Sequence, residues 1–307
     1  MSITEVFCPI CQINIPKQII KQWPGYRLLQ CNACGVKYAD PFKAASADWY
    51  AKFGIYESGF DKKYPLDWRH RKFLSLNLML PTPSKLLDVG CGTGNFLKAA
   101  QDHGYIVHGL DFETRRVEFG TQYYNVSIEV TTLKDHLMAG AKGRYDIVTF
   151  FEFLEHLDNP IEFITEVKRV LRPGGMIGLS VPNAERTFDL SDYIGDYPPH
   201  HLTWWSKKAL RYFLERNGFT DIQIYEEPFD LRRVLFLRIK TGIEQAVMRV
   251  VSGAPSRDGR QRQVLVAKLT RETKNIILSA AIPVGLIAGA LFKLKGIGLL
   301  AVARQVN

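Results

Sequence analysis

Short apolar runs alternate with amphipathic stretches through the middle of the chain. The runs are rich in Leu, Val, Ile and Phe, and they predict buried strands at residues 85–89, 106–111, 127–130, 147–151 and 176–181. Apolar side chains recur at helical spacing in the stretches 95–103, 113–123 and 161–170. Alternation of strands and helices through short loops is typical of an α/β fold, in which helices cover both faces of a mostly parallel sheet.

Two more strands are predicted towards the end of the chain, at residues 222–225 and 298–303. With them, the predicted sheet is Rossmann-like and has seven strands. We expect a core at residues 84–228 that is completed by a final strand segment at 297–307. The stretch between them, 229–296, is predicted to be a helical and partly hydrophobic insertion.

The first strand of this core ends in a turn that is rich in glycine. Gly90, Gly92 and Gly94 alternate after Asp88, and a backbone without Cβ atoms lets a ligand approach closely. The helix predicted after the turn presents free N–H groups to an electron-rich partner. Asp111 ends the next strand about 20 residues later, where a carboxylate can accept hydrogen bonds from ribose hydroxyls. The pattern predicts a composite ligand site at the carboxyl edge of the sheet.

With these residues the chain resembles the class I S-adenosylmethionine-dependent methyltransferases. The motifs that carry the resemblance are DVGCGTG at 88–94, Asp111, YDIV at 145–148, Glu155-His156 and RPGG at 172–175. The core that contains Glu155-His156 is similar to methyltransferases of quinone biosynthesis. The glycines alternate instead of following G-x-G-x-x-G, so a nicotinamide-dependent dehydrogenase is disfavoured.

The resemblance implies a methyltransferase that uses S-adenosylmethionine as its cofactor. By this resemblance, Asp88 and the three glycines hold the methionine part of the cofactor, and Asp111 holds the ribose. Glu155 and His156 are expected beside the cofactor, the alternative being that they only stabilise a loop. The RPGG motif at 172–175 is predicted to be a structural turn.

Four cysteines near the N-terminus form two C-x-x-C pairs, Cys8 with Cys11 and Cys31 with Cys34. Two such pairs at short separation predict a zinc ribbon at residues 1–40, with four thiolates that close the coordination shell of a structural Zn²⁺. A disulfide pair or a redox motif is the alternative. The first residues contain no apolar signal segment, so we expect a cytoplasmic protein with reduced cysteines.

An aromatic-rich linker at residues 41–83 follows the ribbon and includes a predicted helix at 66–80. The resemblance implies that this segment caps the cofactor and the acceptor pocket. The alternative is that its aromatic side chains only pack the ribbon against the core.

A loop at residues 184–205 is the predicted lid over the acceptor. It contains His200 and His201, and imidazole titrates near neutral pH, so either residue can remove a proton from an acceptor. The resemblance favours His201, because the family often has a histidine just before an L-x-x-[WF]-[ST] pattern, which residues 202–206 match here. The alternative is that one histidine only bonds within the lid and that Trp204 and Trp205 are buried packing.

The chain carries a net charge of +9, which suits an anionic partner such as a phosphate-bearing substrate, a lipid surface or a nucleic acid. An uncharged run at 276–292, flanked by lysines within 274–295, is shorter than the ~20 residues that usually span a bilayer. Three interpretations stay open for it: a peripheral membrane contact, a lid or dimer contact, and an ordinary core helix.

The sequence therefore predicts a methyltransferase that acts on a small or lipid-linked acceptor, such as a sugar, a quinone-like compound or a secondary-metabolite intermediate. A zinc-ribbon nucleic-acid-binding protein or an RNA-directed methyltransferase is the alternative. It is disfavoured because few basic residues lie between Cys8 and Cys34. The sequence identifies neither the acceptor atom nor the oligomeric state.

Overall fold

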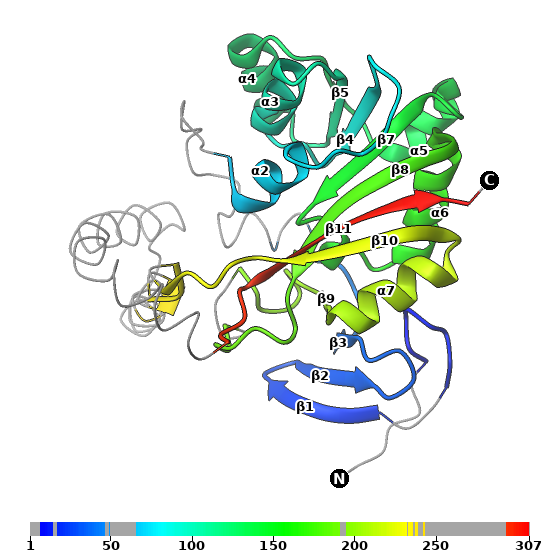
Figure 1. Cartoon of the computed structure of the whole chain (residues 1–307). Helices are drawn as coiled ribbons and strands as arrows, with labels where there is room; N and C mark the ends of the chain where they lie inside the picture. The colour runs from blue at the N-terminus through cyan, green and yellow to red at the C-terminus, as the bar shows by residue number, and fades with distance from the viewer. Residues whose placement is uncertain are drawn as a thin grey trace.

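A seven-stranded sheet lies at the centre of the computed structural model (Figure 1). The structure describes residues 7–14, 17–46, 49, 66–190, 195–231, 233–235, 237–238, 242 and 293–306. The strands are β4 (Lys85–Val89), β5 (Ile106–Asp111), β6 (Ile128–Val130), β7 (Tyr145–Phe151), β8 (Leu171–Pro182), β10 (Phe219–Glu226) and β11 (Gly298–Gln305). Their order across the sheet is β10-β11-β8-β7-β4-β5-β6.

Most neighbouring strands in this sheet run parallel. The pairs β4–β5, β4–β7, β5–β6 and β7–β8 are parallel, whereas β11 is antiparallel to both β8 and β10. This confirms the predicted Rossmann-like sheet of seven mostly parallel strands. The final strand also lies where the apolar run at 298–303 predicted it.

Helices pack on both faces of the sheet and enclose two separate cores. The helical elements are α2 (Trp68–Leu74), α3 (Asn95–Asp102), α4 (Thr114–Tyr124), α5 (Leu133–His136), the π-helix η1 (Leu137–Ala141), the 3₁₀ helix η2 (Leu154–His156), α6 (Pro160–Val170) and α7 (Lys207–Arg216). Along β11, Leu299 and Ala301 face the core under α6 and α7, while Leu300 and Val302 face the core under α2 and α3. This alternation is the two-residue period of a strand that is buried on both faces.

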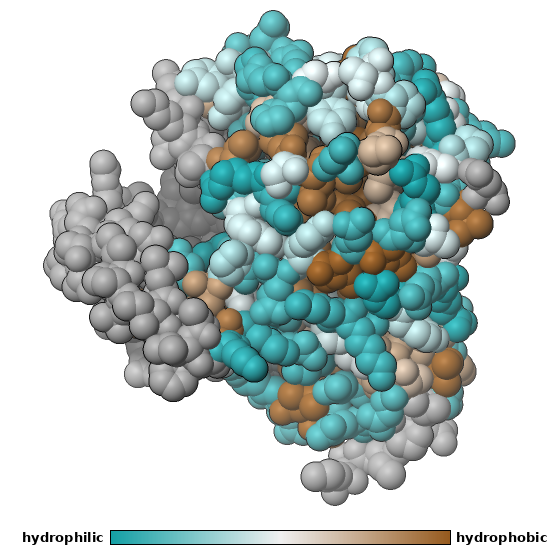
Figure 2. Space-filling view, in the orientation of Figure 1, coloured by the Kyte–Doolittle hydropathy of each residue, from teal (hydrophilic) through white to brown (hydrophobic). Residues whose placement is uncertain are grey.

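A second, smaller sheet joins the N-terminal segment to the predicted lid. It contains β1 (Lys17–Trp23), β2 (Tyr26–Cys31), β3 (Lys37–Asp40) and β9 (Thr203–Trp204), in that order and with antiparallel pairing. Figure 1 shows this sheet below the large one. Polar side chains dominate the corresponding lower part of the molecule in the same view (Figure 2). The first three strands come from the predicted ribbon, and β9 begins two residues after His201.

The helix predicted at 66–80 is shorter than expected, because α2 ends at Leu74. Pro81 and Pro83 follow closely, and a residue before proline is disfavoured in helical geometry. Met79 has a φ of +50°, which is also incompatible with a continuing helix.

The RPGG motif at 172–175 is not a separate turn, because β8 already begins at Leu171. Tyr145 pairs with Leu171, and the register of β7 and β8 then shifts before Ile147. Gly174 has a φ of +69°, which allows this irregular strand start. The motif is therefore the irregular beginning of a strand.

Some of the predicted regions lie outside the described residues. These are residues 50–65 of the aromatic linker, residues 191–194 of the lid, and residues 243–292 of the insertion, which include the apolar run at 276–292. In the described part of the chain, no helix is both long enough and apolar enough to cross a membrane.

Candidate active site

The glycine turn connects β4 to α3 at the carboxyl edge of the sheet. Gly90, Gly92 and Gly94 have φ values of +72°, +56° and +75°, which side chains rarely adopt. A Cβ on Gly90 would also lie 2.5 Å from the ring of Phe153. The backbone N–H groups of Gly90 and Cys91 donate to the carbonyl of Leu110 at 2.8 and 3.1 Å. The turn is thus fixed against the end of β5, and glycine is required at these positions.

Asp111 ties the two strand ends together. Its Oδ2 accepts from the backbone N–H of Gly92 at 2.8 Å, and its Oδ1 accepts from the N–H of Glu113 at 2.9 Å. Each carboxylate oxygen has a second lone pair, so Asp111 can still accept hydrogen bonds from a ligand. The structure therefore brings Asp111 and the glycine turn together at one edge.

Asp88 lies below the same turn and is buried. Its Oδ1 accepts from Oγ1 of Thr149 at 2.7 Å. Burial raises the pKa of Asp88 to about 7, and the nearby charge of Asp111 adds to the shift. Two neighbouring acids in a glycine cradle fit a ligand that carries positive charge, and S-adenosylmethionine has both an ammonium and a sulfonium group.

The raised pKa of Asp88 predicts a pH-dependent stability. The folded chain holds this proton up to about pH 7 and the unfolded chain only to about 3.8, so the free energy of unfolding falls as pH rises between these values. Asp88→Asn removes this loss. Without cofactor, we expect its stability advantage over wild type to grow by roughly 3 kcal/mol from about pH 5 to pH 8.5. Urea unfolding of both proteins at the two pH values measures this advantage. If the difference between their free energies of unfolding were the same at both pH values, the raised pKa of Asp88 would be wrong.

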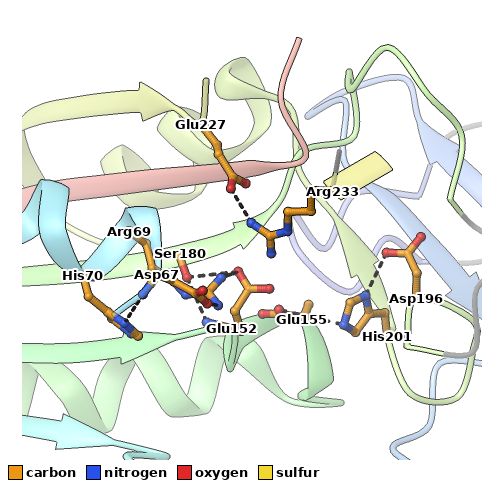
Figure 3. A network of polar contacts seen from close by, with 10 residues as sticks. All are labelled: Asp67, Arg69, His70, Glu152, Glu155, Ser180, Asp196, His201, Glu227 and Arg233. Carbon is orange, nitrogen blue, oxygen red and sulfur yellow. Dashed lines mark hydrogen bonds and ion pairs between the residues drawn. The ribbon is translucent and has the colours of Figure 1, made fainter. Parts of the chain in front are cut away.

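A polar network extends from the end of β7 to α2 (Figure 3). Glu152 follows β7 directly and has a φ of +49°, an unusual geometry for a residue with a side chain. Its Oε1 is 2.9 Å from Nη1 of Arg69 and accepts from Oγ of Ser180 at 3.0 Å. Burial would raise the pKa of Glu152, but the charges of Arg69, His201 and Arg233 lower it below its ordinary value. Glu152 is therefore ionised at the carboxyl edge of the large sheet.

Glu152, Arg69 and Ser180 were not among the residues predicted from the sequence. Glu152 lies three residues before Glu155 of the recognisable Glu155-His156 pair, which is the one signal that could have indicated it. Arg69 reaches the site from α2 and Ser180 from β8, and neither belongs to a motif.

The structure groups Glu155 and His156 with the two lid histidines. Nδ1 of His156 bonds the carbonyl oxygen of His200 at 2.6 Å, and Nε2 of His201 lies 4.0 Å from Oε1 of Glu155. Nδ1 of His201 bonds Oδ1 of Asp196 at 3.0 Å. The contacts of Glu155 and His156 are thus with the predicted acceptor side, whereas Asp88 and Asp111 lie around the glycine turn.

Asp196 is itself fixed by an arginine. Nη1 of Arg186 donates to Oδ1 of Asp196 at 3.1 Å, and Nη2 forms an ion pair with Oδ2. Burial would raise the pKa of Asp196, but Arg186 and His201 hold it well below its ordinary value. Asp196 therefore stays ionised and orients the imidazole of His201, as a carboxylate does for a histidine base.

The four cysteines meet at one point beside β2. Sγ of Cys8 is 3.7 Å from Sγ of Cys34, Sγ of Cys11 is 3.6 Å from Sγ of Cys31, and all four lie within 4.8 Å of one another. A tetrahedral ion with Zn–S distances of about 2.3 Å places its sulfur ligands about 3.8 Å apart. All four cysteines are free thiols in this arrangement. The donor set therefore fits a zinc ion.

The ribbon holds the lid through backbone and aromatic contacts. The N–H of Ala39 in β3 donates to the carbonyl of Leu202 at 2.9 Å, and the N–H of Leu202 donates to the carbonyl of Glu155 at 2.7 Å. Trp23 stacks on Trp204 with ring centroids 6.3 Å apart. Trp204 and Trp205 are both buried, as the packing alternative predicted. The histidines of the lid thus lie between the ribbon and the sheet.

Residues 60–224 match a family model described as a methyltransferase domain. Among curated proteins, the ubiquinone biosynthesis O-methyltransferase of Haemophilus ducreyi is 35% identical over 108 residues, which are 32% of this chain and 45% of that protein. The enzyme of the same name from Coxiella burnetii is 28% identical over 170 residues, which are 48% of this chain and 71% of that protein. The chain thus spans less than half of the first relative.

Two solved structures have a similar fold. A SAM-dependent methyltransferase from Archaeoglobus fulgidus superposes with a TM-score of 0.50 at 17% identity, covering 77% of this chain and 91% of that one. Phosphoethanolamine N-methyltransferase 2 of Haemonchus contortus, in complex with S-adenosyl-L-methionine, gives 0.51 at 16% identity, with coverages of 84% and 56%. At this identity the likeness concerns the fold alone.

Proposed function

Because this chain belongs to the class I S-adenosylmethionine-dependent methyltransferase family, we propose that it transfers a methyl group to a hydroxyl oxygen of a quinone-like small molecule. One observation carries the proposal: the glycine turn and Asp111 follow β4 and β5, and the lid with the His201–Asp196 pair follows β8 and bonds to Glu155 after β7. These four strands run parallel, so both groups lie at their carboxyl ends. Glu152 lies between them in the chain and interacts electrostatically with His201. The names of the two O-methyltransferase relatives support an oxygen acceptor.

The cofactor half of the site is assigned to the glycine turn. Asp88 and Gly90, Gly92 and Gly94 would hold the methionine part, and Asp111 would accept from the ribose hydroxyls. When bound, S-adenosylmethionine supplies an electrophilic methyl group. The chain has only to place the acceptor in line with that methyl group and to receive a proton.

The acceptor half is assigned to the histidines. The acceptor oxygen would take the methyl group, and the sulfur of the bound cofactor would keep the electrons of the carbon–sulfur bond. The hydroxyl proton passes to Nε2 of His201, whose Nδ1 is held by Asp196. His200 lies beside His201, with ring centroids 5.1 Å apart, and contributes to the shape of this half.

The four cysteines are assigned a structural zinc ion. Their burial and sulfur separations support it, because four thiolates leave no open coordination position for chemistry. A nucleic-acid acceptor has less support than a small molecule, given the relatives. Sugar, secondary-metabolite and lipid-linked acceptors are the next candidates to test after phenols.

The assignment of His201 predicts a selective loss of turnover. His201→Gln removes the proton acceptor but keeps a polar side chain of similar size, so kcat should fall about 100-fold at neutral pH. The affinity for S-adenosylmethionine should stay unchanged, because Asp88 and Asp111 do not contact His201. Mass-spectrometric detection of the methylated product, with a panel of catechols and hydroxyquinones as acceptors, measures the effect.

His103→Gln is the matched control, because His103 is an exposed histidine at the end of α3. It should retain wild-type turnover. Full activity in His201→Gln would remove His201 from the reaction. Methyl transfer to sugars but not to any phenol would overturn the proposed acceptor class while leaving the cofactor site intact.

A further inference from the structure

Two histidines and a glutamate converge where the edge strand of the large sheet meets α5. Leu110 of β5 pairs with Glu129 of β6, and His108 comes two residues before Leu110, so the side chains of His108 and Glu129 project from the same face. His136 is the last residue of α5, and its ring stacks on that of His108 with centroids 5.2 Å apart. Three separate elements thus bring together groups that can each bind a metal ion.

The distances in this cluster are those of a shared ion. One ligand atom from each of the three residues lies within 4.8 Å of those of the other two. Oε2 of Glu129 is 3.1 Å from Nδ1 of His136 and 3.5 Å from Nε2 of His108. A tetrahedral ion that binds nitrogen and oxygen at about 2.0–2.1 Å places its ligand atoms about 3.3 Å apart. Both nitrogen atoms therefore lie at a suitable distance from the carboxylate oxygen.

The other nitrogen of each ring already has a hydrogen-bond partner. Nδ1 of His108 bonds Oγ of Ser127 at 2.8 Å, and Nε2 of His136 bonds the hydroxyl of Tyr145 at 2.9 Å. A hydroxyl oxygen can accept from an imidazole N–H, which leaves the lone pairs on Nε2 of His108 and on Nδ1 of His136. A hydrogen bond from the nitrogen that does not bind the ion is the usual way in which metal-binding histidines are oriented.

Nε2 of His108 is left unsatisfied by the protein itself. This atom is buried and makes no hydrogen bond within the described part of the chain, although Oε2 of Glu129 is 3.5 Å away. A buried polar atom without a partner is unfavourable. An ion between Glu129 and the two rings would satisfy this nitrogen and would balance the charge of the carboxylate.

We propose that His108, Glu129 and His136 form a second metal site, which binds Zn²⁺ with water in the remaining coordination positions. Imidazole nitrogen and carboxylate oxygen are common ligands of this ion. The side chain of Glu129 is 48% exposed, so water can reach the open side of the site. The site is distinct from the four cysteines, because its donor atoms are nitrogen and oxygen alone.

The ion would fasten the edge strand of the large sheet. β6 is the last strand in the order across the sheet and pairs with β5 over three residues. An ion shared by the cluster would link β5, β6 and α5 through their side chains. Thr131 follows β6, and its N–H donates to the carbonyl of Asp111 at 3.2 Å, so the link would also support the end of β5. Ion binding here does not depend on the proposed methyl transfer.

The test is titration of Zn²⁺ into the full-length protein, followed by ¹⁵N NMR of the histidine rings, which does not detect binding to the cysteines. We expect the signals of Nε2 of His108 and of Nδ1 of His136 to shift to metal-bound positions, whereas the other nitrogen of each ring stays protonated. His108→Gln and His136→Gln assign these signals by removing them. Each substitution should lower the zinc affinity of the site by about 100-fold, because it removes one of three protein ligands.

His103→Gln is the matched control, because His103 is an exposed histidine outside the cluster. It should bind zinc as the wild type does. Added zinc should slow amide hydrogen exchange at residues 128–131 in the wild type and the control, but not in His136→Gln. Unchanged ring signals of His108 and His136 at saturating zinc, or a response of the lid histidines alone, would overturn the proposal. This measurement uses the wild type, so it holds even if a variant fails to fold.

Discussion

Replacing Asp111 by asparagine is expected to lower the affinity for S-adenosylmethionine by about 1,000-fold. Two hydrogen bonds from ribose hydroxyls to a carboxylate contribute roughly 1.5–3 kcal/mol each. Gly92 and Glu113 donate their backbone N–H groups to different oxygens of Asp111, and an amide keeps only one acceptor oxygen, so one of these two bonds is lost. The substitution therefore weakens the ligand contact and the turn that shapes the site. Isothermal titration with S-adenosylhomocysteine and S-adenosylmethionine measures the change.

Asp102→Asn is the matched control for this experiment. Asp102 ends α3 and forms an exposed pair with Lys98, and such pairs contribute little. Its cofactor affinity should equal that of the wild type. If Asp111→Asn binds as tightly as the control, Asp111 does not hold the ribose.

Removal of the zinc ion that we propose for the four cysteines is expected to abolish methyl transfer while leaving cofactor binding within about threefold of the wild type. A ribbon of this size depends on its metal to fold. When β3 loses its geometry, the pairing of Tyr38 with Thr203 and the bond from Ala39 to Leu202 are lost. These contacts hold the lid that carries His200 and His201. The glycine turn lies on a different sheet and should keep its shape.

A mercurial that displaces thiolate-bound zinc, or Cys8→Ser, creates this state. Proteolysis tests whether the ribbon has unfolded, titration with the cofactor tests whether its binding is retained, and product formation tests whether methyl transfer is lost. Gln22→Ala is the control, since Gln22 is exposed on β1 and should leave all three readings unchanged. Parallel loss of cofactor binding and activity would mean that the ribbon supports the whole fold instead of the lid.

Much of the large sheet could be predicted because its information is local. Each strand is a short apolar run, and each helix has its own 3.6-residue period. The glycine turn and Asp111 were also recognisable, because the turn requires backbone geometry that only glycine adopts readily. These features depend on neighbouring residues, so a single sequence is enough to indicate them.

The parts that escaped prediction depend on contacts between distant segments. The pairing of β3 with β9 joins residues 37–38 to residues 203–204, and two residues of strand give no periodic signal. Glu152 acquires its environment from Arg69 and Ser180, which belong to other elements. The contacts of Glu155 and His156 with His200 and His201 join η2 to the lid, so they give no local signal either, and the place of this pair beside the cofactor stays a prediction.

The central claim is that the glycine turn binds S-adenosylmethionine and that the bound methyl group is transferred to oxygen. The most direct measurement is a reaction with methyl-labelled S-adenosylmethionine and a catechol acceptor, with the product analysed by mass spectrometry. We expect one labelled methyl group on a hydroxyl oxygen of the product, together with S-adenosylhomocysteine, and a rate about 1,000-fold lower for Asp111→Asn at cofactor concentrations well below its Kd. Product formation at the wild-type rate by Asp111→Asn, or a label on carbon or nitrogen, would contradict it.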